Sequence, residues 1–112
     1  MSVSECRILI VDDNATARKT LSKQLNDWGV KTHTAENTEQ AISILEDKHA
    51  QNTHYDLILI DLLMPNKDGI QLCNAIKESP KFDSVKRVLM APINMSFDSN
   101  FSSRHKLDYI LP

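Results

Sequence analysis

The sequence predicts an α/β fold, a doubly wound five-stranded parallel sheet in a single domain. Two observations predict it. Short apolar runs typical of buried strands alternate with segments whose apolar residues recur at helical spacing. The connections are short, and right-handed crossovers between parallel strands place helices on both faces of a sheet. The 112 residues show no linker, repeat or shift in composition, so we expect residues 1–112 to form one domain.

The first strand and helix are predicted close to the amino terminus. Arg7–Val11 (RILIV) is a β-branched run that stops at an acidic pair, which is typical of a central strand buried on both faces. Asn14 can cap the following helix, and Gly29 suits the position after its end. One stripe of this helix is expected to cover the sheet: Ala17, Leu21, Leu25 and Trp28.

The next two strands and helices follow the same pattern. The half-polar run from Val30 (VKTHTA) predicts a strand, and Asn37 with Gln40 resembles a capping box that opens a helix. The apolar residues of that helix are Ala41, Ile42, Ile44 and Leu45. Asp56–Ile60 (DLILI) predicts the third strand, and after a loop another helix reaches the residues before Pro80. Its apolar residues are Leu72, Cys73 and Ile76.

The last third of the chain predicts two further strands, Arg87–Ala91 (RVLMA) and Asp108–Leu111 (DYIL). Residues 92–106 are rich in Ser and Asn, so we expect any helix there to be short or loosely held and the segment to be mobile. The sequence stops at Pro112 without a closing helix. We therefore expect a domain truncated before its last helix, with an uncovered apolar sheet face.

Charge and hydropathy argue against two classes of partner. The formal net charge of −2, with basic residues scattered among acidic ones, gives no footprint for nucleic acid or an anionic membrane. No apolar run approaches the roughly 20 residues of a bilayer span, and no signal peptide is evident, so we expect a cytoplasmic protein without direct membrane contact. The cysteines and histidines lack metal-ligand spacing: Cys6, Cys73, His33, His49, His54 and His105.

Three acidic residues stand at the predicted carboxyl ends of two strands: Asp12, Asp13 and Asp61. Doubly wound sheets bind ligands at this edge. If the two strands are neighbours, the three carboxylates cannot all stay ionised without a cation, and Mg²⁺ suits such oxygen ligands. A carboxylate can also be the nucleophile in phosphoryl transfer. Asp61, which stands apart from the fixed pair, is the natural acceptor.

Each acidic residue also has a simpler interpretation. Asp12 and Asp13 could only cap the following helix, and Asp61 could only begin a turn. The loop that would complete this turn contains ordinary turn residues: Pro65, Asn66 and Gly69. The joint placement of all three carboxylates at strand ends favours a site.

The segments ILIVDDNATARKTL and DLILIDLLMPNKDG strongly resemble the response-regulator receiver domain of two-component signalling. The sequence DDNATARKTLSKQLNDWG is similar to that of receivers attached to hybrid sensor histidine kinases. The resemblance covers nearly the whole chain and implies a flavodoxin-like, CheY-like fold with its final helix missing. It also implies that Asp61 accepts a phosphoryl group from a phosphohistidine. The implied Mg²⁺ ligands are Asp13 and Asp61 directly, Asp12 largely through water, and the backbone carbonyl of Leu63.

The resemblance fails at two positions of the family pattern. A Ser or Thr is expected just after the fourth strand, but the candidate positions hold Met90, Ala91 and Pro92, and the nearest downstream hydroxyl is that of Ser96. A Lys before a Pro is expected at the end of the fifth strand. Either Leu111 has replaced this Lys, or the sequence stops one residue before it. The usual aromatic position falls at or next to Tyr109.

These features favour a phosphoacceptor domain that exchanges phosphate with a histidine kinase or a histidine phosphotransfer domain. Such a domain catalyses its own modification and turns over no separate substrate. The alternative is a pseudo-receiver, an interaction module that does not use phosphorylation, which the missing hydroxyl favours. An aspartyl phosphatase is disfavoured because Leu63 stands where a second Asp is expected. A nucleotide-binding loop is disfavoured because the two glycines, Gly29 and Gly69, build no phosphate cradle. The uncovered sheet face predicts a possible dimer.

Overall fold

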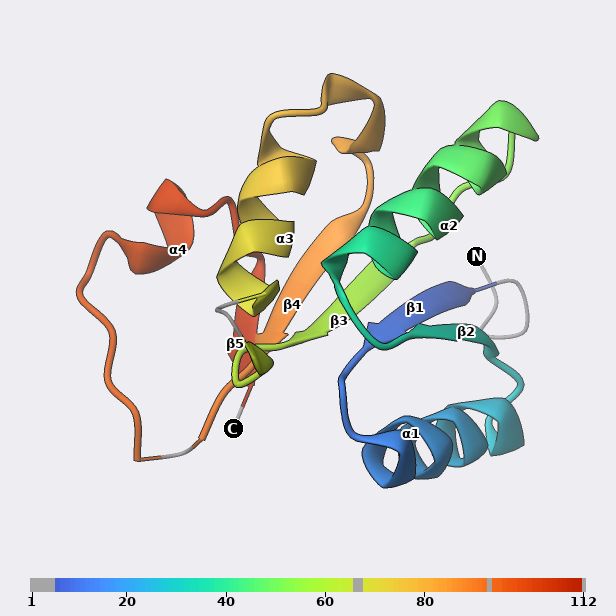
Figure 1. Ribbon diagram of the computed structural model, residues 1–112, viewed down its shortest axis with the longest axis horizontal. Helices are drawn as coiled ribbons and strands as arrows, with labels where there is room; N and C mark the ends of the chain where they lie inside the picture. Colours follow the sequence, from blue (N-terminus) through green and yellow to red (C-terminus); the bar gives the residue numbers. More distant parts are fainter. Residues whose placement is uncertain (1–5, 66–67, 93, 112) are drawn as a thin grey trace.

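The computed structural model describes residues 6–65, 68–92 and 94–111. Its five strands form one parallel sheet in the order β2-β1-β3-β4-β5, which confirms the predicted doubly wound sheet (Figure 1). The strands are β1 Arg7–Val11, β2 Lys31–Ala35, β3 Leu57–Asp61, β4 Lys86–Met90 and β5 Tyr109–Leu111. The central strand β3 and its neighbour β1 carry the predicted acidic residues at their carboxyl ends.

Helices lie on both faces of the sheet. They are α1 Ala15–Asp27, α2 Thr38–Ala50, α3 Asp68–Lys77, the 3₁₀ turn η3 Pro80–Phe82 and α4 Phe101–Arg104. Figure 1 shows α2 and α3 on one face and α1 on the other, with α4 beyond α3 at the β5 side. Within the described ranges, no helix is long and apolar enough to cross a membrane.

The alternation of side chains along each strand divides the core between the two faces. The larger cluster lies under α2 and α3 and contains Leu9, Val11, Ile58, Ile60, Leu72, Ile76 and Leu89. The smaller cluster lies under α1, where Ile8, Ile10 and Val30 pack against the partly buried Leu21 and Leu25. Each strand of the β1–β3 pair therefore contributes to both clusters, as expected of strands covered on two faces.

Both predicted helix caps are present. Asn14 Oδ1 accepts the Ala17 N–H at 3.1 Å, and Asn37 Oδ1 accepts the Gln40 N–H at 2.8 Å. The return bond of the capping box differs from the expectation, because Gln40 Oε1 accepts the N–H of Glu36 at 3.0 Å and not that of Asn37. The box is therefore one residue wider than the usual motif.

The prediction that Trp28 covers the sheet is wrong. Helix α1 ends at Asp27, so Trp28 is its C-cap and is 73% exposed. Gly29 then turns the chain with a φ of 91°, a value that favours glycine. The rest of the stripe is partly buried, and α1 contains no fully buried residue.

Strands β3 and β5 each begin one residue later than predicted. In each case the predicted first residue is an Asp whose carboxylate accepts a backbone N–H of the neighbouring strand. Asp56 Oδ2 accepts the Arg7 N–H at 2.8 Å, and Asp108 Oδ2 accepts the Arg87 N–H at 2.8 Å. Both acidic residues therefore precede β3 and β5. Strand β3 also includes Asp61. Strand β4 runs from Lys86 to Met90, one residue earlier at each end than predicted, and β2 begins at Lys31, one residue after the predicted Val30.

The segment after β4 contains α4, a helix of four residues, which agrees with the predicted short helix. Strand β5 is the last described element, and Pro112 lies outside the described residues. Tyr109 is 70% exposed and Leu111 is 44% exposed. Within the described part of the chain, no helix covers the β4–β5 end of the α1 face.

Candidate functional site

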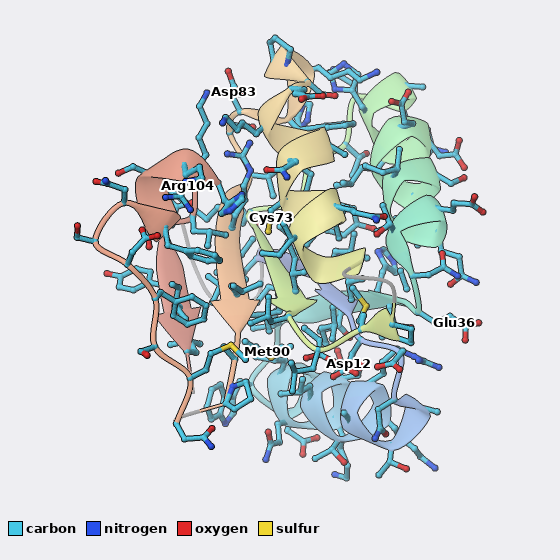
Figure 2. All side chains as sticks on the ribbon, turned by 60° about the vertical axis from the view of Figure 1, so that its left-hand side comes forward. Asp12, Glu36, Cys73, Asp83, Met90 and Arg104 are labelled. Carbon is cyan, nitrogen blue, oxygen red and sulfur yellow. The ribbon has the colours of Figure 1, made fainter. Side chains whose placement is uncertain are left out.

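The three predicted carboxylates meet at one end of the sheet. The register pairs Val11 of β1 with Ile60 of β3, so Asp12 and Asp61 follow at the same level. One carboxylate oxygen from each of Asp12, Asp13 and Asp61 lies within 4.8 Å of the others. Asp12 is buried, Asp61 is half-buried and Asp13 is exposed, so the cluster opens to solvent on one side. Figure 2 shows Asp12 at the same end of the sheet as Met90.

Asp12 is held from several directions. Its Oδ1 accepts the Asn14 N–H at 2.9 Å, its own N–H donates to the Ala35 carbonyl at 3.1 Å, and its carbonyl accepts Arg18 Nη1 at 2.7 Å. Sequence reasoning missed Arg18. The available signal was a basic residue in the first turns of the helix that follows the acidic pair, which brings its guanidinium back over the strand end.

The Asp61 carboxylate is oriented by the loop that follows it. Asp61 Oδ1 accepts the Leu63 N–H at 3.0 Å. Burial raises the pKa of Asp61, the Leu63 hydrogen bond acts in the opposite direction, and the neighbouring Asp12 and Asp13 raise the pKa further. The site thus favours a proton or a cation at this carboxylate.

Gly69 lets the start of α3 approach the end of β3. A Cβ at this position would lie 2.5 Å from the carbonyl oxygen of Asp61 and 3.0 Å from Cα of Leu62. Any larger residue would displace the backbone that carries the acidic side chain. Of the predicted turn residues, Pro65 is exposed, and Asn66 lies outside the described residues.

The positions where a hydroxyl is expected lie beside Asp61. The sheet register pairs Asp61 with Met90, and Met90 with Leu111. Ala91 is buried and its N–H donates to the Leu111 carbonyl at 2.8 Å, while Pro92 is half-buried. None of the three candidate residues, 90 to 92, carries a hydroxyl. Ser96 is exposed, and Tyr109 pairs with Val88, two residues before the level of Asp61.

Comparison with known proteins identifies the family. Residues 8–106 match the family described as the response regulator receiver domain. The chain belongs to this family. The predicted resemblance to receiver domains is thereby confirmed, and the acidic cluster lies where the receiver motif residues were expected.

Two bacterial relatives illustrate how far the likeness of this receiver domain extends. It is 40% identical over 75 residues to the transcriptional regulatory protein ResD of Bacillus subtilis, which covers 67% of this chain and 29% of ResD. It is 29% identical over 92 residues to the protein PilG of Pseudomonas aeruginosa, which covers 82% of this chain and 64% of PilG. The chain therefore spans under two thirds of either relative.

Solved structures share the fold. The response regulator TrrA of Thermotoga maritima, solved in complex with Mg²⁺-BeF, is 30% identical with a TM-score of 0.72, covering 95% of this chain and 84% of TrrA. The signal receiver domain of a signal transduction histidine kinase from Syntrophus aciditrophicus is 28% identical with a TM-score of 0.76, covering 95% and 76%. The chemotaxis regulator CheY4 of Vibrio cholerae is 20% identical with a TM-score of 0.77, covering 94% and 83%. The predicted CheY-like fold is confirmed.

The acidic cluster of this receiver domain is typical of a Mg²⁺ site. Oxygens bound at about 2.1 Å to one octahedral Mg²⁺ lie about 3 to 4 Å apart. The three carboxylate oxygens lie within 4.8 Å of one another, which is close to that spacing. Small side-chain rotations therefore suffice to gather them around one ion. The donor set, which is all carboxylate oxygen, is the chemistry that Mg²⁺ prefers.

An apolar hollow of about 460 Å³ adjoins the acidic cluster. Leu62 and Leu63, which directly follow Asp61, form one side of it, and Leu63 is 58% exposed. The other lining residues are Ile70, Met95, Phe97, Phe101 and His105. Sequence reasoning missed this hollow because it joins the β3–α3 loop to the irregular segment before α4.

Proposed function

We propose that this chain is a phosphoacceptor receiver domain in a phosphorelay, with Asp61 as the acceptor. The observation that supports this function is the gathering of Asp12, Asp13 and Asp61 at the carboxyl ends of β1 and β3. The proposed receiver domain spans residues 1–112. Asp61 is crowded by two other carboxylates and is open to solvent on one side. Such a carboxylate is suited to accept a phosphoryl group when a cation is bound beside it.

The proposed reaction transfers a phosphoryl group from a phosphohistidine. A carboxylate oxygen of Asp61 forms a bond to phosphorus while the bond from phosphorus to the imidazole nitrogen breaks. The electron pair of the broken bond stays on that nitrogen, which then takes up a proton. The Leu63 N–H, 3.0 Å from Asp61 Oδ1, holds the carboxylate plane during this attack.

The residues that would hold Mg²⁺ in this proposal are Asp12, Asp13, Asp61 and the backbone carbonyl of Leu63. When bound, the ion offsets the negative charge of the carboxylates and of the phosphoryl oxygens. The buried Asp12 is fixed by its bonds to Asn14 and Arg18, so it contributes a preset ligand position. Asp13 is exposed and remains free to turn towards the ion.

We place this domain in a hybrid sensor histidine kinase, with a histidine kinase or histidine phosphotransfer domain as its partner. The likeness to the receiver domain of a histidine kinase, at 28% identity, supports this context. The missing hydroxyl at positions 90 to 92 also fits it, because a relay needs acceptor chemistry more than a strong conformational switch. ResD is a transcriptional regulatory protein and not a kinase, so the context is a proposal about this chain.

Phosphoryl uptake tests the proposed function. The protein is incubated with acetyl phosphate with and without Mg²⁺, and its intact mass is measured. We expect a gain of one phosphoryl group that depends on Mg²⁺ and is lost in Asp61→Asn. The matched control is Asp27→Asn, because Asp27 is an acidic residue on the exposed end of α1 with only a surface pair to Lys23 at 3.0 Å.

A pseudo-receiver is the second candidate function. The observation that favours it is that residues 90 to 92 provide no hydroxyl beside Asp61. In that case the folded protein binds Mg²⁺, but gains no mass from acetyl phosphate or from a phosphohistidine donor. That result would exclude the phosphoacceptor function.

A further inference from the structure

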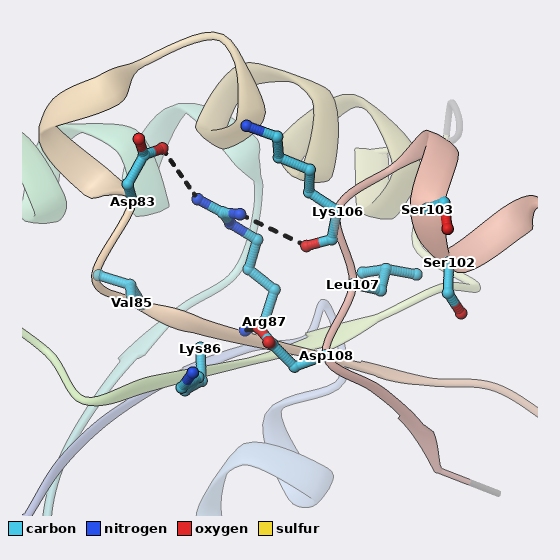
Figure 3. Close-up of a pocket in the computed structure, with 9 residues that line it drawn as sticks. All are labelled: Asp83, Val85, Lys86, Arg87, Ser102, Ser103, Lys106, Leu107 and Asp108. Carbon is cyan, nitrogen blue, oxygen red and sulfur yellow. Dashed lines mark hydrogen bonds and ion pairs between the residues drawn. The ribbon is translucent and has the colours of Figure 1, made fainter.

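A second pocket lies at the edge of the sheet opposite to Asp61. It has a volume of about 370 Å³, is open to solvent, and is lined by the start of β4, by α4 and by the turn that leads into β5 (Figure 3). The residues that matter for its chemistry are Lys86, Arg87, Ser102, Ser103, Lys106 and Asp108. Because Arg87 pairs with Ile58 and Met90 pairs with Asp61, the pocket stands at the amino ends of the strands, away from the acidic cluster.

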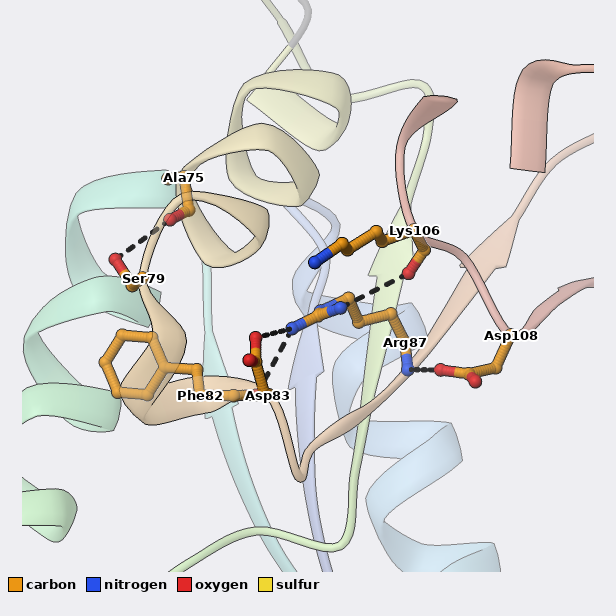
Figure 4. A network of polar contacts seen from close by, with 7 residues as sticks. All are labelled: Ala75, Ser79, Phe82, Asp83, Arg87, Lys106 and Asp108. Atoms are coloured by element: carbon orange, nitrogen blue, oxygen red, sulfur yellow. Dashed lines mark hydrogen bonds and ion pairs between the residues drawn. The ribbon is translucent and has the colours of Figure 1, made fainter. Parts of the chain in front are cut away.

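Arg87 is the buried centre of this pocket, with an exposed fraction of 4%. Its Nη2 donates to the Phe82 carbonyl at 3.2 Å, and its Nη1 donates to the Lys106 carbonyl at 3.4 Å (Figure 4). Asp83 approaches Nη2 only to 3.9 Å, and its side chain is 58% exposed. The Nε–H of Arg87 is buried and has no hydrogen-bond partner among the described residues. An unpaired charged donor at this depth is costly.

The other unpaired polar side chains of the pocket are also donors. Within the described ranges, the ammonium groups of Lys86 and Lys106 have no ion pair, and Ser102 and Ser103 add two hydroxyls to the lining. Both carboxylates at the pocket lie beside Arg87. Asp108 Oδ2 accepts its backbone N–H at 2.8 Å, and Asp83 faces its guanidinium. The pocket therefore holds three cations, two carboxylates and an excess of donors.

We propose that this pocket binds a phosphate-type oxyanion, either as the free ion or as a small phosphomonoester. Such an ion offers several acceptor oxygens, which can pair with the Lys106 ammonium and a serine hydroxyl, and the buried positive charge of Arg87 adds electrostatic attraction. The volume lies in the range of small-molecule sites, so it admits a phosphate group with a short substituent. Binding would join α4, which carries Ser102, to β4, which carries Arg87.

The test is a ¹⁵N–¹H NMR titration of the full chain without Mg²⁺, at constant ionic strength. Inorganic phosphate is the probe in one arm and glycerol 3-phosphate in the other. We expect saturable shifts at Ser102, Ser103, Lys106 and the side-chain Nε–H of Arg87, with none at Asp12 or Leu63. Lys106→Gln and Ser102→Ala should each weaken binding about tenfold, since each removes one donor to a charged ligand. Lys19→Gln, on the exposed side of α1, is the matched control and should bind as the unchanged chain does.

Each outcome decides the proposal. Tighter binding of glycerol 3-phosphate identifies a phosphomonoester as the ligand, and equal or weaker binding identifies the free ion. Shifts that do not saturate, or that fall equally on Lys19→Gln and Lys106→Gln, would mean general attraction to surface lysines and would overturn the proposal. Shifts confined to the Asp61 end of the sheet would overturn it as well. If Lys106→Gln lowers stability, Ser102→Ala still tests the pocket, because Ser102 lies on α4 and bears no charge.

Discussion

Asp61 carries an electrostatic cost when no cation is bound. Burial and the two neighbouring carboxylates raise its pKa, so the folded state favours the protonated form. The sign of the linkage follows directly. The cost is absent at low pH, grows as the pH rises through the ordinary pKa of an Asp, and is complete above the raised pKa of the folded state. At neutral pH the ionised carboxylate therefore lowers stability.

Asp61→Asn should relieve this cost while abolishing phosphoryl uptake. Because the site is open to solvent, we expect a gain of only about 0.5 kcal/mol in the free energy of unfolding at pH 7 without Mg²⁺. The gain should shrink as the pH falls and reverse when Mg²⁺ is added, since the ion stabilises the wild-type carboxylate cluster by binding the folded state. Urea unfolding at several pH values measures it. A loss of stability without Mg²⁺ would contradict the crowded-carboxylate account.

Gly69→Ala should damage both fold and site. The new Cβ would lie 2.5 Å from the Asp61 carbonyl oxygen, and a backbone atom cannot move away as a flexible side chain can. We expect a loss of about 1–3 kcal/mol in unfolding free energy, which is typical of overpacking. We also expect slower uptake from acetyl phosphate. Ser43→Ala, on an exposed position of α2, controls for the effect of alanine in a helix, and an equal result for both variants would contradict the clash.

The acidic residues of the site could be predicted because the signal for them lies in the adjacent sequence. Asp12, Asp13 and Asp61 each follow an apolar strand pattern, and parallel strands bring their carboxyl ends to one edge. The roles of Asp56 and Asp108 could not be predicted in this way. Each accepts an N–H from a distant strand, and such a bond depends on a neighbour that the local sequence does not specify.

At the scale of the helix, the cap of α2 is the clearest testable feature. Asn37→Ala removes the acceptor that binds the Gln40 N–H at 2.8 Å, so it should lower the unfolding free energy by about 1 kcal/mol. Asn37→Ser keeps an acceptor in place and should lose much less. Thermal unfolding monitored by circular dichroism compares the two. Equal losses would mean that the residue matters for another reason.

The positions of helices and strands were predicted from the spacing of apolar residues and from capping and turn residues. The errors fall where tertiary contacts determine the local structure. Trp28 fits the spacing of the α1 stripe, yet the helix ends one residue earlier and leaves the indole exposed. Helix α4 has four residues in a segment with little helical patterning, so its existence depends on packing. Phe101 packs against the main core cluster, and His105 Nδ1 pairs with Asn74 Oδ1 of α3 at 2.8 Å.

At the scale of the whole molecule, the sheet is covered unequally. Helices α2 and α3 cover one face, whereas α1 is the helix that the described residues place on the other (Figure 1). On this second face a pocket of about 390 Å³ is lined by Leu57, Val88 and Tyr109 among others. Tyr109 and Leu111 are exposed there at 70% and 44%. An apolar surface of this kind favours association.

We therefore predict that the chain forms a dimer through this face, with an equilibrium that depends on concentration. Leu111→Lys should weaken the dimer at least tenfold, because a charged group would have to lose its water at an apolar contact. Sedimentation velocity over a range of concentrations measures the change. Trp28→Lys is the matched control, since Trp28 is a larger exposed apolar residue between α1 and β2, and β2 is the edge strand opposite to β5. If both variants weaken the dimer equally, non-specific hydrophobic association explains it. If the chain is monomeric at every concentration, the open face does not bind a second copy. Because β5 is an edge strand next to Met90 and the Asp61 site, a dimer that depends on Leu111 would also place the partner copy close to the phosphoacceptor.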